Sequence, residues 1–182
     1  MNSRNLSVFF NPKSIAVIGA SPKPMKLGYK TMESILKSRF KGKLYPVNIK
    51  GGNVLGLNIY RSLNEIPEDI DLAIIAIPAP AVPKIMKECG EKGVKGAIIY
   101  SAGFGEIMEG KTLEKEVLDI AKEYDITILG PNCYGLINFN EGLNLTFTPD
   151  INLENEGETL LARAAKFYAE YLEQAAKELE QE

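Results

Sequence analysis

The sequence predicts an α/β protein with a doubly wound parallel sheet of about five strands, followed by a long C-terminal amphipathic helix. Short continuous apolar runs, typical of strands buried on both faces, alternate with segments in which apolar residues recur every three or four positions. Each run also ends in small or turn-forming residues. This alternation indicates parallel strands joined by right-handed crossovers, with helices on both faces of the sheet.

The first strand is expected at residues 14–18, and a helix from near 25–28 to near 40–42, where Gly42 would follow its last turn. Three small residues follow the strand: Gly19, Ala20 and Ser21. A short turn before a helix presents free backbone N–H groups and the positive end of the helix dipole, which together suit a phosphate. The turn therefore favours a phosphorylated ligand, although an ordinary turn between a strand and a helix has the same composition.

The remaining elements follow the same two patterns. We expect strands at 44–48, 71–77, 97–100 and 126–129, a helical turn at 62–66, and helices at 81–92 and 111–124. Pro46 indicates that the second strand lies towards an edge of the sheet. In an open parallel sheet a ligand binds beyond the carboxyl ends of the strands, so the five loops there are candidates for one shared site.

Composition limits the classes of function. The chain has 182 residues, of which 45% are hydrophobic and 25% charged, as expected for one soluble domain with an appendage. It has no apolar run near the roughly 20 residues of a membrane-spanning helix, and residues 1–11 lack the apolar core of a signal peptide. Cys89 and Cys133 have no metal-ligand spacing. We therefore expect a cytoplasmic protein with neither a membrane partner nor a metal site.

The chain contains no histidine. This excludes Ser-His-Asp and Cys-His hydrolysis and histidine-based zinc sites within the chain, and we assign no catalytic residue. Acidic residues concentrate in 154–182, where eight Glu stand against Arg163, Lys166 and Lys177, while residues 1–153 carry a slight excess of cations. So weak an excess is compatible with an anionic ligand but does not favour nucleic acid. The lack of Trp and the preference for Lys, Glu and Ile favour a thermophilic source.

The loop after the second strand narrows the choice of ligand. A fold that binds NAD needs an acidic residue there for the ribose hydroxyls, but this loop holds Asn48 and Lys50. A cation in this place favours a nucleotide with an additional phosphate, either NADP or coenzyme A. The spacing from Gly19 to Gly28 also differs from the compact glycine pattern of dinucleotide folds.

Five loop motifs follow one another along the chain. They are Gly19-Ala20-Ser21 with Lys26 and Gly28, Tyr45-Pro46-Val47-Asn48, Ile77-Pro78-Ala79-Pro80, Ser101-Ala102-Gly103-Phe104-Gly105-Glu106, and Gly130-Pro131-Asn132-Cys133. Together, over about Leu6 to Pro149, they resemble the CoA-binding domain of the NDP-forming acyl-CoA synthetases. The resemblance is greatest to α subunits of ADP-forming acetyl-CoA synthetases and weaker to those of succinyl-CoA synthetases. It implies a Rossmann-like fold that binds CoA or acyl-CoA across the strand ends.

The resemblance also implies which residues bind the ligand. Around the phosphates it places Gly19, Ala20, Ser21, Lys26, Gly28 and Lys50. Along the nucleotide and the pantetheine arm it places Asn48, Pro78, Ser101, Ala102 and Gly103, with Asn132 near the thiol.

The C-terminal segment differs in composition. Apolar residues recur every three or four positions in a background rich in Ala, Glu, Lys and Gln, which predicts an amphipathic helix over about 158–180. We therefore divide the chain into a CoA-binding domain, 1–150, and a linker with this helix, 151–182. The regularity of the helix is typical of an engineered segment. We expect it either to pack on a domain surface or to mediate self-association.

In the resembling family a further domain carries a phosphorylated histidine, which this sequence lacks. The parent activity would be acid–thiol ligation, and the chain alone is expected to bind CoA without turnover. Two alternatives stay open at this point: an NADP-binding oxidoreductase domain, and an engineered oligomer whose pocket is vestigial.

Overall fold

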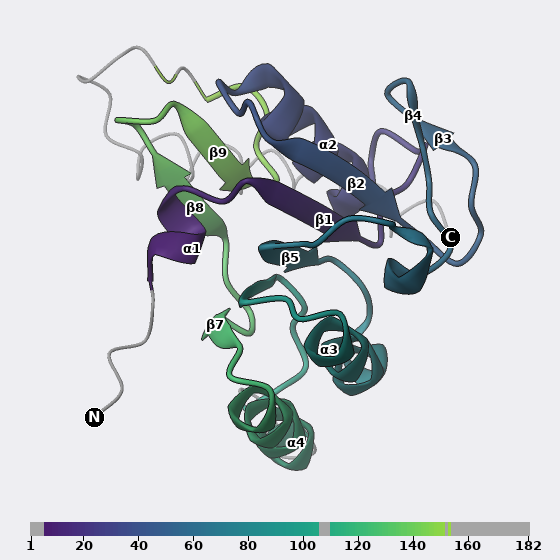
Figure 1. The fold of residues 1–182 in the computed structure, drawn as a ribbon, viewed down its shortest axis with the longest axis vertical. Helices are drawn as coiled ribbons and strands as arrows, with labels where there is room; N and C mark the ends of the chain where they lie inside the picture. Colours follow the sequence, from purple (N-terminus) through teal and green to yellow (C-terminus); the bar gives the residue numbers. More distant parts are fainter. Residues whose placement is uncertain (1–5, 106–109, 152, 154–182) are drawn as a thin grey trace, which may run out of the picture.

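The chain is built around a five-stranded parallel sheet, seen in a computed structural model that describes residues 6–105, 110–151 and 153. The strand order is β2-β1-β5-β6-β7 (Figure 1). The strands are β1 (Ser14–Ile18), β2 (Lys43–Val47), β5 (Leu72–Ile75), β6 (Gly96–Ile99) and β7 (Thr127–Leu129). Every pairing in the sheet is parallel, which confirms the predicted α/β fold class. The strand that contains Pro46 lies at an edge, also as predicted.

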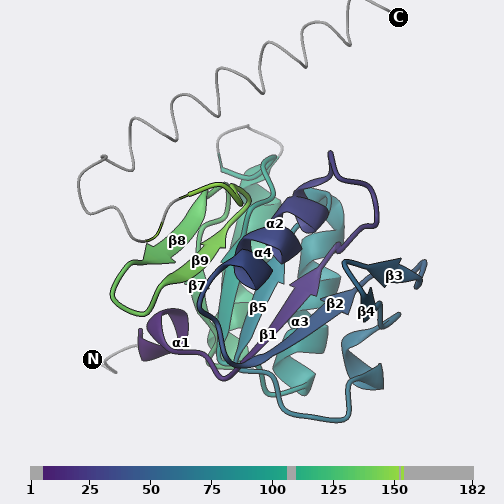
Figure 2. The same ribbon diagram turned by 90° about the horizontal axis from the view of Figure 1, so that it is seen from above.

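Different elements cover the two faces of the sheet (Figures 1 and 2). One face carries α1 (Ser7–Phe10), α2 (Leu27–Lys37) and an antiparallel hairpin of β8 (Gly135–Asn138) and β9 (Leu143–Thr146). The other face carries α3 (Val82–Glu91) and α4 (Gly110–Glu123). Shorter elements complete the chain: β3 (Asn53–Val54), β4 (Leu57–Asn58), and the 3-10 turns η1 (Leu63–Glu65) and η2 (Ala79–Ala81).

The central strands are buried on both faces. In β1, Ile15 and Val17 pack into the cluster under α2, whereas Ala16 and Ile18 pack into the cluster under α3 and α4. A strand with no solvent face has no place for alternating polar residues, which explains the continuous apolar runs in the sequence.

The end of α2 corrects one expectation. The helix stops at Lys37, earlier than the predicted end near 40–42, because Ser38 adopts an extended conformation. The Ser38 hydroxyl donates to the carbonyl oxygen of Ile35 at 2.6 Å and accepts the Phe40 N–H at 3.2 Å. Gly42 is therefore not the residue after the last turn. It lies against the chain entering β1, where an added Cβ would be 2.2 Å from the Lys13 carbonyl oxygen.

Cys89, on the buried side of α3, is expected to make the stability of the protein depend on pH. Burial raises the pKa of this thiol to about 12. Well below about pH 8.5, the usual pKa of a thiol, Cys89 is protonated in both states; at higher pH the unfolded chain loses a proton that the folded chain keeps. The free energy of unfolding should therefore fall with rising pH, by up to about 1.4 kcal/mol per pH unit from this group, until the folded thiol also ionises.

Urea unfolding between pH 7 and 11 checks this expectation by comparison with Cys89→Ala. The variant should lose stability less steeply than the parent above about pH 9, with a constant difference between the two proteins below pH 8. Parallel curves over the whole range would show that Cys89 is not the responsible group.

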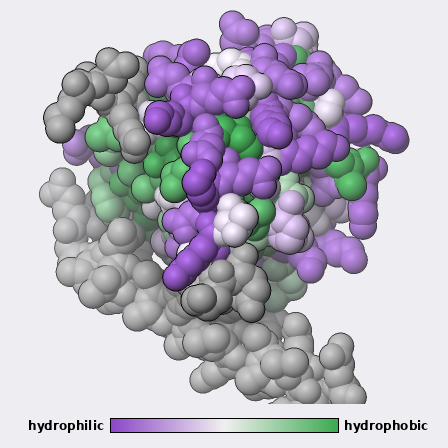
Figure 3. All heavy atoms as spheres, turned by 90° about the horizontal axis from the view of Figure 1, so that it is seen from below, coloured by the Kyte–Doolittle hydropathy of each residue, from purple (hydrophilic) through white to green (hydrophobic). Residues whose placement is uncertain are grey.

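The surface on the side of α3 and α4 is mainly hydrophilic (Figure 3). Within the described residues, no helix is long and apolar enough to cross a membrane. The predicted amphipathic helix at 158–180 lies outside the described residues.

Candidate functional site

A cavity of about 610 Å³ opens at the carboxyl ends of β1, β2, β5 and β6. Most residues predicted for the site line it: Gly19, Ser21, Lys26, Gly28, Asn48, Lys50, Pro78 and Ser101. The others do not reach its surface: Ala20, Ala102, Gly103 and Asn132. The loops after four strands thus meet at one place, as the parallel topology requires.

Two glycines let the first turn and the start of α2 pack together. Gly19 has a φ of +94°, and a Cβ there would lie 2.3 Å from the carbonyl oxygen of Ala76. A Cβ on Gly28 would lie 2.0 Å from the carbonyl oxygen of Gly19. No side chain fits at either position, so both glycines are required by close backbone approach.

The N-terminus of α2 faces this cavity, since Lys26, Leu27 and Gly28 all line it. Lys26 is the extended residue before the helix, and the first backbone N–H groups of a helix have no acceptor within it. Ser21 shapes the preceding loop, because its hydroxyl accepts the Lys23 N–H at 3.2 Å. Free amides and the positive end of the helix dipole make this edge suited to an anion.

Asn48 joins the loops after β1 and β2. Its side-chain nitrogen donates to the Ala20 carbonyl oxygen at 2.8 Å, and its side-chain oxygen accepts the Lys50 N–H at 3.0 Å. Ala20 also donates its N–H to the Val47 carbonyl oxygen at 3.2 Å, and its side chain is buried in the core under α2. Ala20 thus belongs to the core next to the site, and Asn48 holds the backbone of Lys50 in position.

Replacing this bridge should loosen the two loops. Asn48→Ala removes two hydrogen bonds and should lower the free energy of unfolding by about 1–3 kcal/mol. Asn64→Ala, at an exposed position in η1, is the matched control and should change it by less than about 0.5 kcal/mol. Urea unfolding of both variants measures the difference; equal effects would mean that the bridge contributes nothing.

The loop after β6 is held by hydrogen bonds to three other segments. Ser101 donates its hydroxyl to the Ile77 carbonyl oxygen, which ties this loop to the one after β5. Tyr100 donates to the Leu145 carbonyl oxygen at 2.7 Å, and burial raises the pKa of its phenol. Asn132, which is exposed, donates its N–H to the Ser101 carbonyl oxygen at 3.0 Å. The β7 loop therefore lies beside the cavity wall without forming part of it.

The charge of the cavity is positive. Lys23, Lys26 and Lys50 line it, and no carboxylate is found among the described residues of its wall. Lys23 was not singled out by the sequence analysis; its place between Pro22 and Pro24, in the turn before α2, is the signal that could have identified it. Three cations around free helix amides suit a ligand with several phosphate charges.

Cys133, the second cysteine of the chain, does not line this cavity. In the part of the chain that the structure describes, no group of His, Cys, Asp and Glu could hold a metal ion. Cys133 is half-buried, its thiol contacts the Ile99 carbonyl oxygen at 3.4 Å, and burial raises its pKa. A raised pKa disfavours the thiolate that nucleophilic attack needs.

Comparison with known proteins gives a consistent result. A family model described as a CoA binding domain matches residues 13–138. The α subunit of acetate–CoA ligase (ADP-forming) I from Pyrococcus furiosus is 47% identical over 150 residues, which cover 80% of this chain and 32% of that protein.

Two solved structures have the same fold over most of the chain. A protein of Pyrococcus horikoshii OT3 matches with a TM-score of 0.75 and 52% identity, over 78% of this chain and 33% of that one. The dinucleotide-forming acetyl-coenzyme A synthetase 1 of Ca. Korarchaeum cryptofilum, in complex with phosphate and ADP, matches with a TM-score of 0.77 and 36% identity, over 81% and 32%. The chain spans about a third of the length of the α subunits of acetate–CoA ligases I and II from Pyrococcus furiosus.

Proposed function

The chain belongs to the CoA binding domain family, and from this premise we propose that it binds coenzyme A or acyl-CoA in the cavity at the carboxyl ends of β1, β2, β5 and β6. The observation that carries the proposal is the convergence of three lysines and the N-terminus of α2 on one cavity. Coenzyme A carries a pyrophosphate and a 3′-phosphate, so its nucleotide half needs two separate places for negative charge.

We assign these two places to different loops. The pyrophosphate would lie against the α2 amides, with Ser21 and Lys26 beside it, and the 3′-phosphate would lie near Lys50. Asn48 and Pro78 would contact the adenosine. The pantetheine arm would leave the cavity past Ser101 and continue outside it along Ala102 and Gly103 towards Asn132.

The proposed activity of this chain is binding without turnover. The relative from Pyrococcus furiosus is named as a subunit of an ADP-forming acetate–CoA ligase, but this sequence has no histidine to carry a phosphoryl group. Transfer would therefore require a group from outside these 182 residues. Formation of acetyl-CoA by the purified chain, from CoA with acetyl phosphate or with ATP and acetate, would contradict this part of the proposal.

Calorimetric titration with CoA, dephospho-CoA and NADPH tests the ligand. We expect saturable CoA binding that weakens when the 3′-phosphate is absent, with little binding of NADPH. Tighter binding of NADPH than of CoA would favour the alternative of an NADP-binding oxidoreductase domain. The titration is needed because Lys50 would suit the additional phosphate of either ligand. No binding of any of the three would overturn the proposal.

A further inference from the structure

A second cavity, of about 260 Å³, lies at the opposite end of the sheet, beside the chain entering β1 and β2. Its apolar lining includes Phe10, Phe40 and Leu143, and its cationic lining comprises Lys13, Arg39 and Lys41. Glu141 is the single acidic residue of the lining that the structure describes. We call this surface the amino-end groove. It combines aromatic rings with an excess of positive charge, and it has no part in the proposed CoA site.

Apolar side chains extend the amino-end groove onto the neighbouring surface. Phe10 is 44% exposed, and Leu6, one helical turn earlier, is 56% exposed. Asn138 donates its side-chain nitrogen to the Phe10 carbonyl oxygen at 3.1 Å, which holds the turn of the β8–β9 hairpin, with Phe139 at 40% exposure, beside α1. Three large apolar residues grouped in this way on the surface are typical of a face that another segment covers.

The chemistry of residues 158–180 is complementary to this surface. Their sequence carries Phe167, Tyr168 and Tyr171 at helical spacing, within a region in which Glu outnumbers Lys and Arg. Aromatic residues from such a segment would meet the exposed phenyl rings of the amino-end groove, and its carboxylates would meet the lysines of the rim.

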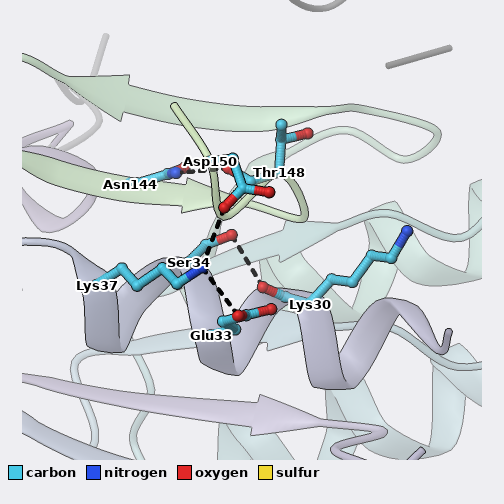
Figure 4. A network of polar contacts seen from close by, with 7 residues as sticks. All are labelled: Lys30, Glu33, Ser34, Lys37, Asn144, Thr148 and Asp150. Atoms are coloured by element: carbon cyan, nitrogen blue, oxygen red, sulfur yellow. Dashed lines mark hydrogen bonds and ion pairs between the residues drawn. The ribbon is translucent and has the colours of Figure 1, made fainter. Parts of the chain in front are cut away.

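The described chain also ends near a residue that adjoins the lining of the amino-end groove. Asp150 accepts a hydrogen bond from the Lys37 ammonium at 3.0 Å, so the chain passes over the last turn of α2 (Figure 4). Lys37 lies only two residues before Arg39, which lines the groove. The four residues 154–157 between Leu153 and this segment can span about 14 Å when extended, so the segment begins close to the end of the described chain.

We propose that residues 158–180 pack their apolar side against the amino-end groove of the same chain. The contact would cover Phe10 and Phe139 and place acidic residues of the segment beside Lys13 and Lys41. It would leave the CoA cavity at the other end of the sheet open.

A double-mutant cycle in the full-length chain tests this contact by thermal unfolding. Phe10→Asp and Phe167→Asp should each lower the Tm by several degrees, and the double variant should be no less stable than the worse single one. Leu118→Asp is the control, because Leu118 is 49% exposed on α4, on the other face of the sheet, and its effect should add to that of Phe167→Asp. Additive effects of Phe10→Asp and Phe167→Asp, or no effect of Phe167→Asp, would overturn the proposal.

The mass of the protein in solution shows whether residues 158–180 of the same chain or of a second copy cover the amino-end groove. We expect a monomer over a hundredfold range of protein concentration. A dimer that Phe167→Asp converts to a monomer would assign the groove to a second copy and overturn packing within one chain. Titration of the same variants with CoA keeps the two proposals separate, because an unchanged CoA affinity is expected even where the packing contact is lost.

Discussion

Gly19→Ala should destabilise the domain by about 2–5 kcal/mol and abolish CoA binding. The residue has a φ of +94°, which costs a residue with a Cβ about 1–2 kcal/mol. The added Cβ would also lie 2.3 Å from the Ala76 carbonyl oxygen, and overpacking of this kind costs about 1–3 kcal/mol. Because the clash pushes the β1 turn away from the β5 loop, it should distort the cavity where the α2 amides are presented.

Gly52→Ala separates the cost of the backbone conformation from the cost of the close contact. Gly52 has a similar φ of +107°, but no atom lies within 4 Å of an added Cβ. This variant should lose only the 1–2 kcal/mol that the backbone conformation costs, to within about 0.5 kcal/mol, and should keep CoA affinity. Urea unfolding and CoA titration of both variants give the comparison. If the two variants are equally stable, the close approach of Gly19 to Ala76 adds nothing to the loss of stability.

Lys50→Glu should weaken CoA binding by about 10- to 100-fold. A charge-assisted hydrogen bond contributes about 1.5–3 kcal/mol, and each 1.4 kcal/mol changes the dissociation constant tenfold. Repulsion between the new carboxylate and the 3′-phosphate adds to this loss. Dephospho-CoA, which lacks that phosphate, should bind the variant nearly as well as it binds the parent. Calorimetric titration measures, for CoA and for dephospho-CoA, the ratio of the dissociation constants of the variant and the parent.

Lys87→Glu provides the matched control. It makes the same change of charge at an exposed position of α3 that does not line the cavity. Only a small decrease in CoA affinity is expected, and it should disappear at high salt. If Lys50→Glu weakens CoA and dephospho-CoA equally, the 3′-phosphate lies elsewhere.

The sheet could be predicted because its strands are buried on both faces. Leu72 to Ile75 form a continuous apolar run for this reason, and Pro46 marked the edge strand because it cannot donate a ladder hydrogen bond. The loops that meet at the cavity followed directly from the parallel topology, which brings all carboxyl ends of the strands to one edge.

The β8–β9 hairpin could not be predicted in the same way. Leu143, Leu145 and Phe147 alternate with polar residues, a pattern that indicates a strand with one solvent face. Here the polar residues are buried too, because Asn144 accepts both the backbone N–H and the hydroxyl hydrogen of Thr146. Such hydrogen bonds between side chains two positions apart cannot be recognised from residue types. The alternation of apolar and polar residues therefore predicts, wrongly, that the polar face of β9 is exposed to solvent.

Details of the site depended on tertiary contacts. The family resemblance placed Ala20 near the phosphates, but its N–H donates to Val47, its carbonyl oxygen accepts from the Asn48 side chain, and its own side chain is buried rather than lining the cavity. Lys23 reaches the cavity because the loop folds back through Ser21. Neither outcome can be deduced from residue type, since both depend on how loops pack against each other.

The central claim is that CoA binds where the carboxyl ends of β1, β2, β5 and β6 meet, and amide NMR during a CoA titration tests it most directly. We expect the largest shifts at Gly19, Ser21, Lys26, Gly28, Lys50 and Ser101, with little change in α4 or in the β8–β9 turn. Saturable binding with its largest shifts at the amino-end groove, or no shifts at all, would contradict the claim.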